Sequence, residues 1–245
     1  MHEKGAKRAT ATARHAVEGT ARERTTLAGV ELGLRNDVYR RPLGTALERL
    51  NLGPGWICAD VGAGGGDVTV ALARLVGPTG RVYAVDIDPA SRDAVAEAAA
   101  REAGAQVVAV TQAAEELLLP EKVDLCYCRF LLMHVVEPED VVARMSLATK
   151  AGGWVLLQEP ITSAGRVGGA ALSMPSARQP DIGAVLPAMV RRAGLELADA
   201  WAEAPAWAGP GPVASYLEDL TGVSPGQDPV VLPPLVTVVA RRQRS

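Results

Sequence analysis

The stretch Asp60–Gly66, with the sequence DVGAGGG, is rich in glycine and lies between two apolar runs that are typical of buried strands. Glycine in such a loop lets the backbone touch a ligand where a Cβ atom would collide with it. A second carboxylate, Asp86, ends the next apolar run. A carboxylate in that place can accept hydrogen bonds from both hydroxyls of a ribose. The pattern therefore predicts a site for an adenosine-containing ligand.

The residue Asp67 indicates which adenosine-containing cofactor the loop would bind. The dinucleotide fingerprint G-x-G-x-x-G needs a small third residue, but counting from Gly62 and Gly64 places Asp67 there. Its carboxylate would repel a pyrophosphate, whereas Asp60 suits a cationic amino group. An adenosine ligand with an amino acid and no phosphate is S-adenosylmethionine, which we predict as the cofactor. A nicotinamide-dependent oxidoreductase is the alternative that these carboxylates disfavour.

From Trp56 to Pro160, predicted strands and helices alternate with short links. The strands are apolar throughout, as expected of parallel strands that are buried on both faces. Residues 161–180 lack periodicity and are predicted to form a loop or lid. The other predicted elements are a helix over 137–153, a helix over 181–194, strand 195–204, a short helix over 211–222, and a last strand over 230–242 with Pro233 and Pro234 near its start or at a bulge.

Four motifs in order carry a family resemblance. The chain resembles the class I S-adenosylmethionine-dependent methyltransferases of the small-molecule branch, well over residues 37–160 and loosely over 180–242. The motifs are DVGAGGG with VDIDP (85–89), AEELLLP (114–120), the run 123–160, and LPPLVTVVARR (232–242).

The resemblance implies an α/β fold, a Rossmann-like seven-stranded sheet in the order 3-2-1-4-5-7-6, with the last strand antiparallel and helices on both faces. It divides the chain into an N-terminal helical or lid segment, 1–36, expected to be partly disordered, and a cofactor-binding domain, 37–245, with a lid loop near 161–180.

The resemblance also implies roles for the residues of the cofactor site. Asp60 holds the amino group, directly or through water or backbone, and Asp86 takes the ribose hydroxyls. Ile87 packs on the adenine, and the N–H of Ala114 meets an adenine ring nitrogen. Tyr39 lies on the helix that should cover the ligand. The remaining expected contacts are made by Gly62, Ala63, Gly64, Ala113, Cys128 and Arg129.

One position departs from the family pattern. An acidic residue usually precedes the position of Ala114 and receives the adenine amino group, whereas this chain has Ala113 there, preceded by Gln112. Either Gln112 takes over this contact, or water does, or the affinity for the cofactor is lower.

Two side chains are candidates for catalysis. His134 follows the fourth strand and could act as a general base, or it could pack the turn before EPED. Glu159 ends the fifth strand and could orient a substrate hydroxyl or amine, or it could bond the backbone of the lid. Cys126 and Cys128 share one face of a strand but lack the partners of a zinc site, so we expect no metal.

We therefore predict methyl transfer from S-adenosylmethionine to oxygen, nitrogen or carbon of a small molecule in specialised metabolism. A non-methylating cyclase that keeps the cofactor and a non-catalytic binding module are the alternatives. A net charge of −3 argues against nucleic acid as a partner, and three cysteines fit the cytoplasm. No apolar run approaches the length of a membrane span. Trp201 and Trp207 could line a substrate pocket or a homodimer contact.

Overall fold

The computed structural model describes residues 34–102, 105–172 and 177–244. Most of the predicted N-terminal segment 1–36 lies outside these residues. Residues 34–38 are helical and lead into α2 (Arg40–Leu50). The apolar side chains that repeat along α2 at helical spacing are buried: Leu43, Leu47 and Leu50.

The main sheet has seven strands in the order β3-β2-β1-β4-β5-β11-β8. The strand β11 runs antiparallel to both of its neighbours, whereas the pairs from β3 to β5 are parallel. This order confirms the predicted order 3-2-1-4-5-7-6. The strands are β1 (Ile57–Val61), β2 (Arg81–Asp86), β3 (Gln106–Thr111), β4 (Val123–Arg129), β5 (Thr149–Pro160), β8 (Leu195–Glu203) and β11 (Leu235–Arg242).

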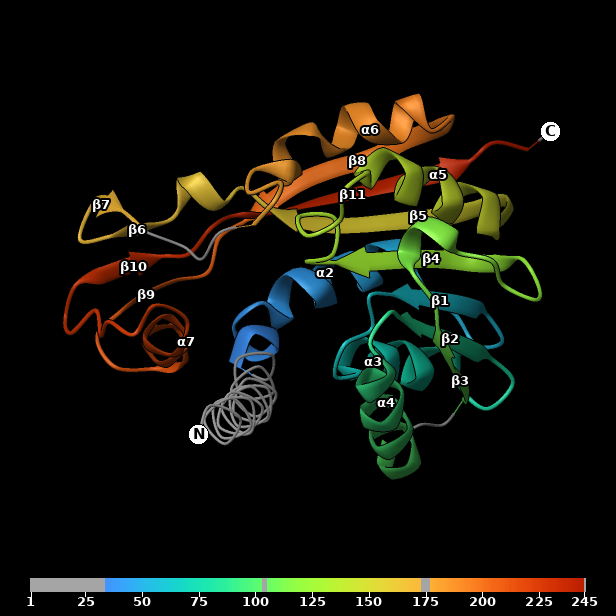
Figure 1. Cartoon of the computed structure of the whole chain (residues 1–245), viewed down its shortest axis with the longest axis horizontal. Helices are drawn as coiled ribbons and strands as arrows, with labels where there is room; N and C mark the ends of the chain where they lie inside the picture. Colours follow the sequence, from blue (N-terminus) through green and yellow to red (C-terminus); the bar gives the residue numbers. More distant parts are fainter. Residues whose placement is uncertain (1–33, 103–104, 173–176, 245) are drawn as a thin grey trace, which may run out of the picture.

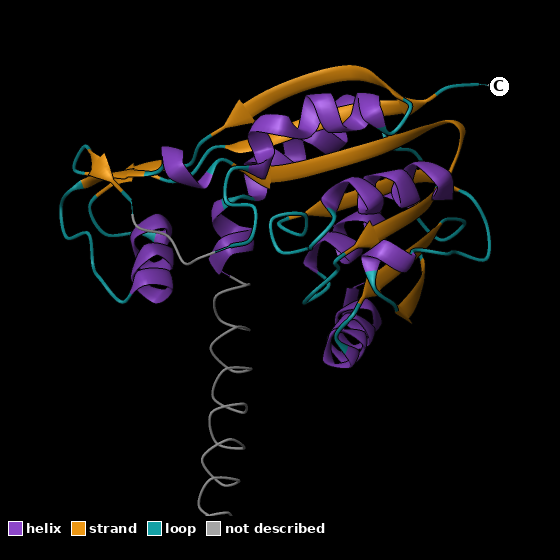
Figure 2. Cartoon of the chain, turned by 45° about the horizontal axis from the view of Figure 1, so that its top comes forward, coloured by secondary structure: helices purple, strands orange, loops and turns teal. Residues whose placement is uncertain are grey.

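Helices cover both faces of this sheet (Figures 1 and 2). One face packs against α2 and α3 (Asp67–Val76), with α4 (Pro89–Glu102) beside them. The other face packs against the 3-10 turn η1 (Ala114–Glu116), α5 (Pro138–Ala148) and α6 (Leu186–Arg192). Among the described residues, no helix has the length and apolar character that crossing a membrane requires.

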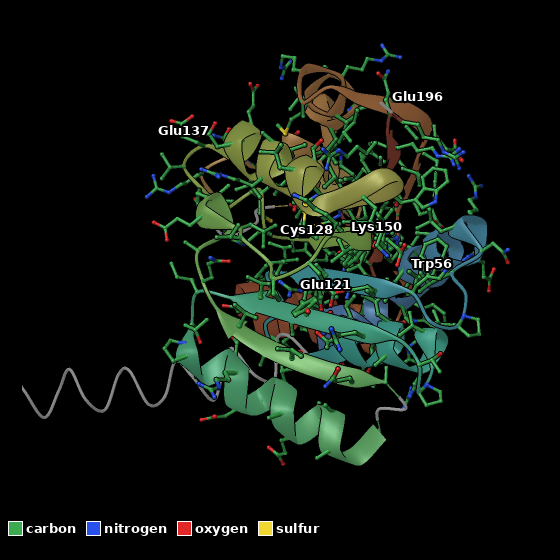
Figure 3. The ribbon with its side chains drawn as sticks, turned by 90° about the vertical axis from the view of Figure 1, so that its right-hand side faces the viewer. Trp56, Glu121, Cys128, Glu137, Lys150 and Glu196 are labelled. Carbon is green, nitrogen blue, oxygen red and sulfur yellow. The ribbon has the colours of Figure 1, made fainter. Side chains whose placement is uncertain are left out.

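Alternation along β4 divides its side chains between the two cores. Cys126 and Cys128 lie in the core with α5 and α6, whereas Leu125 and Tyr127 lie in the core with α2 and α3. The prediction that both cysteines share one face is thereby confirmed. Figure 3 shows Cys128 inside the molecule, between the layers.

Two helices differ from their predicted lengths. The helix predicted over 137–153 ends at Ala148, and β5 begins at Thr149, whose hydroxyl bonds the carbonyl oxygen of Met145 at 2.8 Å. The two glycines at 152–153 favour this early end because glycine is a poor helix former. The helix predicted over 181–194 consists of a 3-10 turn, η3 (Ile182–Val185), followed by α6.

A second, smaller sheet was not predicted. Its order is β7-β6-β10-β9, and helix α7 (Pro212–Thr221) lies beside it. Figure 1 shows this unit at one end of the main sheet, where β5 continues into it. The four strands are β6 (Arg166–Val167), β7 (Ala170–Ala171), β9 (Ala206–Ala208) and β10 (Pro229–Val231).

The second sheet corrects two predictions. The segment predicted as a loop, 161–180, contributes β6 and β7. The single strand predicted over 230–242 is two strands in two sheets, β10 and β11, separated at Leu232–Pro234. Pro233 and Pro234 cause this break because proline has no N–H to donate to a ladder.

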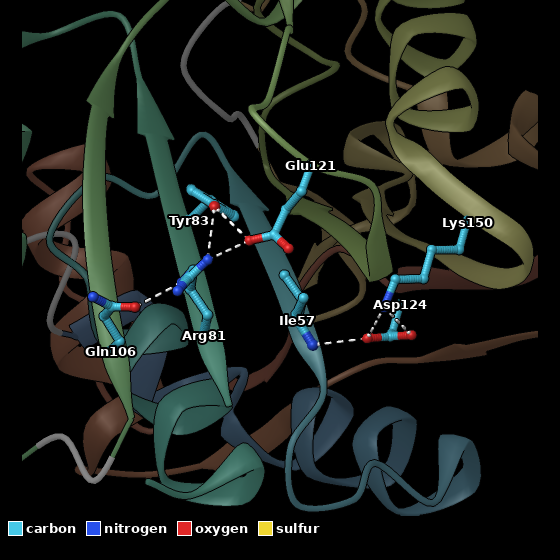
Figure 4. A network of polar contacts seen from close by, with 7 residues as sticks. All are labelled: Ile57, Arg81, Tyr83, Gln106, Glu121, Asp124 and Lys150. Atoms are coloured by element: carbon cyan, nitrogen blue, oxygen red, sulfur yellow. Dashed lines mark hydrogen bonds and ion pairs between the residues drawn. The ribbon is translucent and has the colours of Figure 1, made fainter. Parts of the chain in front are cut away.

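A polar network joins the strands near the start of β1 and β2 (Figure 4). Arg81 on β2 bonds Gln106 on β3 at 2.7 Å and also pairs with Glu121, which accepts from the Tyr83 hydroxyl at 2.8 Å. In the same view, Asp124 on β4 pairs with a lysine at 2.9 Å and accepts a backbone N–H from β1. These contacts align the strands at the edge opposite to the glycine loop.

Candidate active site

The glycine loop is fixed to the end of β2. The N–H groups of Gly62 and Ala63 donate to the carbonyl oxygen of Val85 at 2.8 and 3.0 Å. The N–H of Gly64 donates to Oδ2 of Asp86 at 2.8 Å. The other oxygen of Asp86 accepts the N–H of Asp88 at 2.9 Å. Because each carboxylate oxygen has a second lone pair, Asp86 can hold the loop and still accept from a ligand.

Two glycines of the loop are required for different reasons. Gly66 has φ +86° and packs on α4, since a Cβ atom there would lie 3.1 Å from the Cα of Val95. Gly64 has φ +50°, and a Cβ atom on it would meet nothing within 4 Å. The backbone at Gly64 is therefore uncovered and faces open space, as a loop that receives a ligand should be.

A pocket of about 300 Å³ lies where the ends of β1 and β2 face the turn after β4. It brings together five of the residues predicted for the site. Ile87 is 69% exposed beside it and offers an apolar surface that the protein leaves uncovered. The five residues are Gly62, Asp86, Ile87, Ala114 and His134.

Several other predicted residues do not line this pocket. The carboxylate of Asp60 is buried against α3 and accepts the hydroxyl of Thr69 at 2.6 Å, and burial raises its pKa to about 6. Tyr39 is buried and donates its hydroxyl to the carbonyl of Pro233 at 3.0 Å. Cys128 lies in the core. Ala63 and Ala113 also lie outside the lining.

Arg129 is buried at the end of β4. Its Nη2 donates to the amide oxygen of Asn36 at 2.6 Å, and its Nη1 donates to the carbonyl oxygen of Tyr39 at 3.3 Å. The amide nitrogen of Asn36 donates in turn to Asp67, the first residue of α3. These contacts tie residues 36–39 to the end of β4 and to the first residue of α3.

His134 closes the turn that follows β4. Its backbone N–H donates to the carbonyl oxygen of Leu131 at 2.9 Å, and the residue is exposed at the edge of the pocket. Burial lowers the pKa of this imidazole, and the nearby cation of Arg35 lowers it further. The ring is therefore neutral at pH 7 and able to accept a proton.

Glu159 accepts hydrogen bonds from the backbone of the same turn. Its Oε1 accepts the N–H groups of Leu131 and Leu132, both at 2.8 Å, and its Oε2 has no hydrogen-bond partner in the described part of the chain. Burial raises the pKa of Glu159 to about 7, although the backbone N–H groups oppose this rise. The carboxyl group bonds the turn after β4, whereas the alternative in the sequence analysis was a bond to the lid.

The pocket also contains residues without a predicted role. Gln112, considered above only as a replacement for the missing acid, lines the pocket, and its Oε1 accepts the N–H of Leu118 at 3.1 Å. Arg178 lines the pocket from the segment after β7. The N–H of the next residue, Gln179, donates to the carbonyl oxygen of Met133 at 3.0 Å and so ties this segment to the turn after β4. The aperiodic segment gave no signal for Arg178. The other such residues are Val61, Val85, Glu115, Leu131, Val135 and Val136.

Within the described residues, no three side chains of the metal-binding types gather in one place. The three cysteines are unpaired and buried.

Part of the chain is similar to known methyltransferases. Residues 59–157 match a family described as a methyltransferase domain. The ubiquinone/menaquinone biosynthesis C-methyltransferase UbiE of Burkholderia orbicola is 30% identical over 114 residues, which are 46% of either chain. The chain thus spans about half the length of the curated relatives that it matches.

Solved structures share the fold. A structure described as a putative methyltransferase from Bacillus halodurans has a TM-score of 0.61 at 18% identity, covering 82% of this chain and 98% of the other. The [4+2]-cyclase SpnF has a TM-score of 0.59 at 17% identity, covering 84% and 81%. Residues 59–157 are therefore similar to a methyltransferase domain, and the chain shares the Rossmann-like fold of these solved structures.

Proposed function

We propose that this protein binds S-adenosylmethionine and transfers its methyl group to a small-molecule acceptor. The observation that carries the proposal is the juxtaposition of three features at the ends of β1 and β2. The carboxylate of Asp86 lies beside the uncovered backbone of Gly64 and the exposed side chain of Ile87.

These residues fit an adenosine. The carboxylate of Asp86 has free lone pairs for two ribose hydroxyls, and Ile87 offers an apolar face for a purine. Ala114 lines the pocket, with its backbone near the base, and the Gln112 amide can serve the exocyclic amino group. The cofactor, when bound, supplies a methyl group that its sulfonium has already activated.

The surroundings of the loop disfavour a dinucleotide. A Cβ atom on Gly65 would lie 3.8 Å from Oδ2 of Asp67, so this carboxylate stands beside the backbone where a pyrophosphate would have to lie. A negative charge at that place repels a phosphate, which the N-terminus of α3 would otherwise attract. A ligand with an amino group is favoured instead.

The residues of the turn after β4 supply the remaining chemistry. His134 accepts a proton from a protonated nucleophile, and Glu159 fixes the turn that carries His134. Alignment of the nucleophile with the methyl carbon contributes roughly 7–11 kcal/mol at most. The acceptor approaches from the side of His134 and Arg178, since Asp86 and Ile87 face the adenosine.

The acceptor atom is oxygen, nitrogen or carbon of a specialised metabolite. A carbon acceptor has the support of the matched relative, which is named a C-methyltransferase. The three unpaired cysteines support a reducing compartment such as the cytoplasm.

Calorimetry with S-adenosylhomocysteine and with NAD tests the cofactor. We expect binding of S-adenosylhomocysteine and none of NAD, and the opposite result would contradict the proposal. Mass spectrometry of acceptor mixtures then tests the reaction. A product heavier by one methylene supports transfer, whereas a rearranged product of unchanged mass would support the cyclase alternative.

A further inference from the structure

A larger pocket, called the α7 pocket below, lies between the second sheet and helix α7. Its volume is about 720 Å³, against about 300 Å³ for the pocket at the glycine loop. One wall consists of β6 and β7 with the residue that follows them, Leu172, and the other consists of the end of α7 and the loop after it. Residues 59–157, which are similar to a methyltransferase domain, contribute to neither wall. The α7 pocket is therefore a feature of the C-terminal part of this chain.

The lining of the α7 pocket is mainly apolar. Leu217 in its wall is buried, whereas Val223 is 67% exposed and leaves apolar surface open to solvent. A pocket of several hundred Å³ with an apolar lining and few polar groups is the usual form of a site for a small molecule. The apolar lining residues are Val167, Ala170, Ala171, Leu172, Leu217, Leu220, Val223 and Pro225.

The polar groups of the α7 pocket indicate which molecules it favours. The hydroxyl of Thr221 donates to the carbonyl oxygen of Leu217 at 2.8 Å. Asp228 carries the only charge among the described lining residues, and a Cβ atom on Gly168 would lie 3.4 Å from its Oδ2. In the described part of the chain, no lysine or arginine pairs with this carboxylate. A negative charge without a counter-charge attracts an amine and repels a carboxylate or a phosphate.

The α7 pocket lies at the same edge of the main sheet as the glycine loop. The carboxyl ends of β1, β4 and β5 meet at this edge because the three strands are parallel, and β5 leads from it into the second sheet (Figure 1). Phe130, directly after β4, packs against the apolar cluster that contains Leu217. The next residue, Leu131, lines the pocket at the glycine loop. Consecutive residues of one turn therefore connect the walls of the two pockets.

The length of the chain between the two linings limits how far apart they can be. Leu172 lines the α7 pocket, and Arg178 lines the pocket at the glycine loop. The Cα atoms of two residues six positions apart are separated by at most about 22 Å, even in a fully extended chain. One elongated small molecule can therefore reach both linings.

We propose that the α7 pocket binds the apolar body of the methyl acceptor, and that this acceptor is a mainly apolar molecule with an amine or hydroxyl beside Asp228. The reacting end of the molecule extends toward His134. The inference rests on the proposed function, which supplies the methyl group, and it adds the chemical class of the acceptor. Phosphorylated acceptors such as nucleotides, sugar phosphates and coenzyme A thioesters are disfavoured, because their charges would meet apolar walls and a carboxylate.

Nile red, a neutral apolar dye whose fluorescence rises in apolar surroundings, tests the pocket on the full chain. We expect Val223→Asp to weaken the binding of Nile red by about 10-fold or more, since a charge then replaces part of the apolar wall. Val185→Asp is the matched control, because Val185 is an exposed valine outside the lining, and it should leave the affinity unchanged. Equal affinities of Val223→Asp and the wild type would overturn the inference.

Dodecylamine and dodecanoate test the role of Asp228, because they share one alkyl chain and carry opposite charges. The amine should displace Nile red at a concentration about 10-fold lower than the carboxylate, and Asp228→Asn should remove this preference. The affinity for S-adenosylhomocysteine should stay unchanged in Val223→Asp and Asp228→Asn, because neither residue lines the pocket at the glycine loop. A wild type that did not prefer the amine would contradict the proposed role of Asp228.

Compounds that gain one methylene in the mass-spectrometric assay connect the α7 pocket to the reaction. Such a compound should displace Nile red, and Val223→Asp should raise its KM by about 10-fold with little change in kcat. A methylated compound that left Nile red bound would overturn the inference while the proposed function stood. Nile red binding by a protein that did not bind S-adenosylhomocysteine would instead contradict the proposed function.

Discussion

Glu159 should make the folded protein less stable as the pH rises through neutrality. Its pKa in the folded protein is raised to about 7 by burial, whereas that of an unfolded glutamate is about 4.3. The folded state therefore binds more protons than the unfolded chain between these two values. Stability linked to this proton is complete below about pH 4.3 and is lost as the pH rises through about 7.

The magnitude follows from the separation of the two pKa values. Each pH unit of separation is worth about 1.4 kcal/mol, so the whole effect is roughly 4 kcal/mol, of which most falls between pH 5 and pH 8. Glu159→Gln removes this dependence because an amide does not ionise. The amide keeps a carbonyl oxygen that can accept the N–H groups of Leu131 and Leu132.

Urea unfolding at several pH values between 5 and 8 measures this effect. The free energy of unfolding should fall less steeply with pH in Glu159→Gln than in the wild type, by about 2–3 kcal/mol over the range. Asp60 contributes a slope of the same sign in both proteins, since burial also raises its pKa. Glu196→Gln, at an exposed position on β8, should leave the slope as it is. Identical slopes for Glu159→Gln and the wild type would refute the reasoning.

Three further predictions concern the site and its support. Asp86→Ala should weaken S-adenosylhomocysteine in calorimetry by at least about 100-fold, because two hydrogen bonds to a charged acceptor are lost, and unchanged affinity would place the ribose elsewhere. His134→Ala should lower kcat by roughly 10²–10⁴, and the wild-type rate should rise with pH through a pKa below the ordinary value of about 6.5; a variant with normal kcat would remove its role as base. Gly183→Ala should lower the urea midpoint, since its Cβ atom would lie 2.5 Å from the carbonyl oxygen of Glu159, and an unchanged midpoint would mean that β5 or η3 can shift freely.

The sequence alone determined the elements of the main sheet and the place of the cofactor loop. Apolar runs, helical spacing and glycine punctuation are local signals, and in α/β folds they alternate in a way that leaves few topologies. The sequence singled out Asp86 because it occupies a fixed place at the end of a strand, and the structure places it in the lining of the pocket. The end of α5 and the start of α6 were predicted less accurately, because glycines and 3-10 turns blur the ends of helices.

The tertiary structure decided what the sequence left open. The strands of the second sheet are two or three residues long and pair segments as distant as 166–167 and 229–231, so no periodicity announced them. The roles of Glu159 and Asn36 likewise depend on partners that only folding brings near, the turn after β4 and the pair of Asp67 and Arg129. Local periodicity reports which face of an element is buried. It carries no information about which distant polar group will lie opposite a given side chain. Such contacts between distant polar groups determine which of the candidate residues face the pocket.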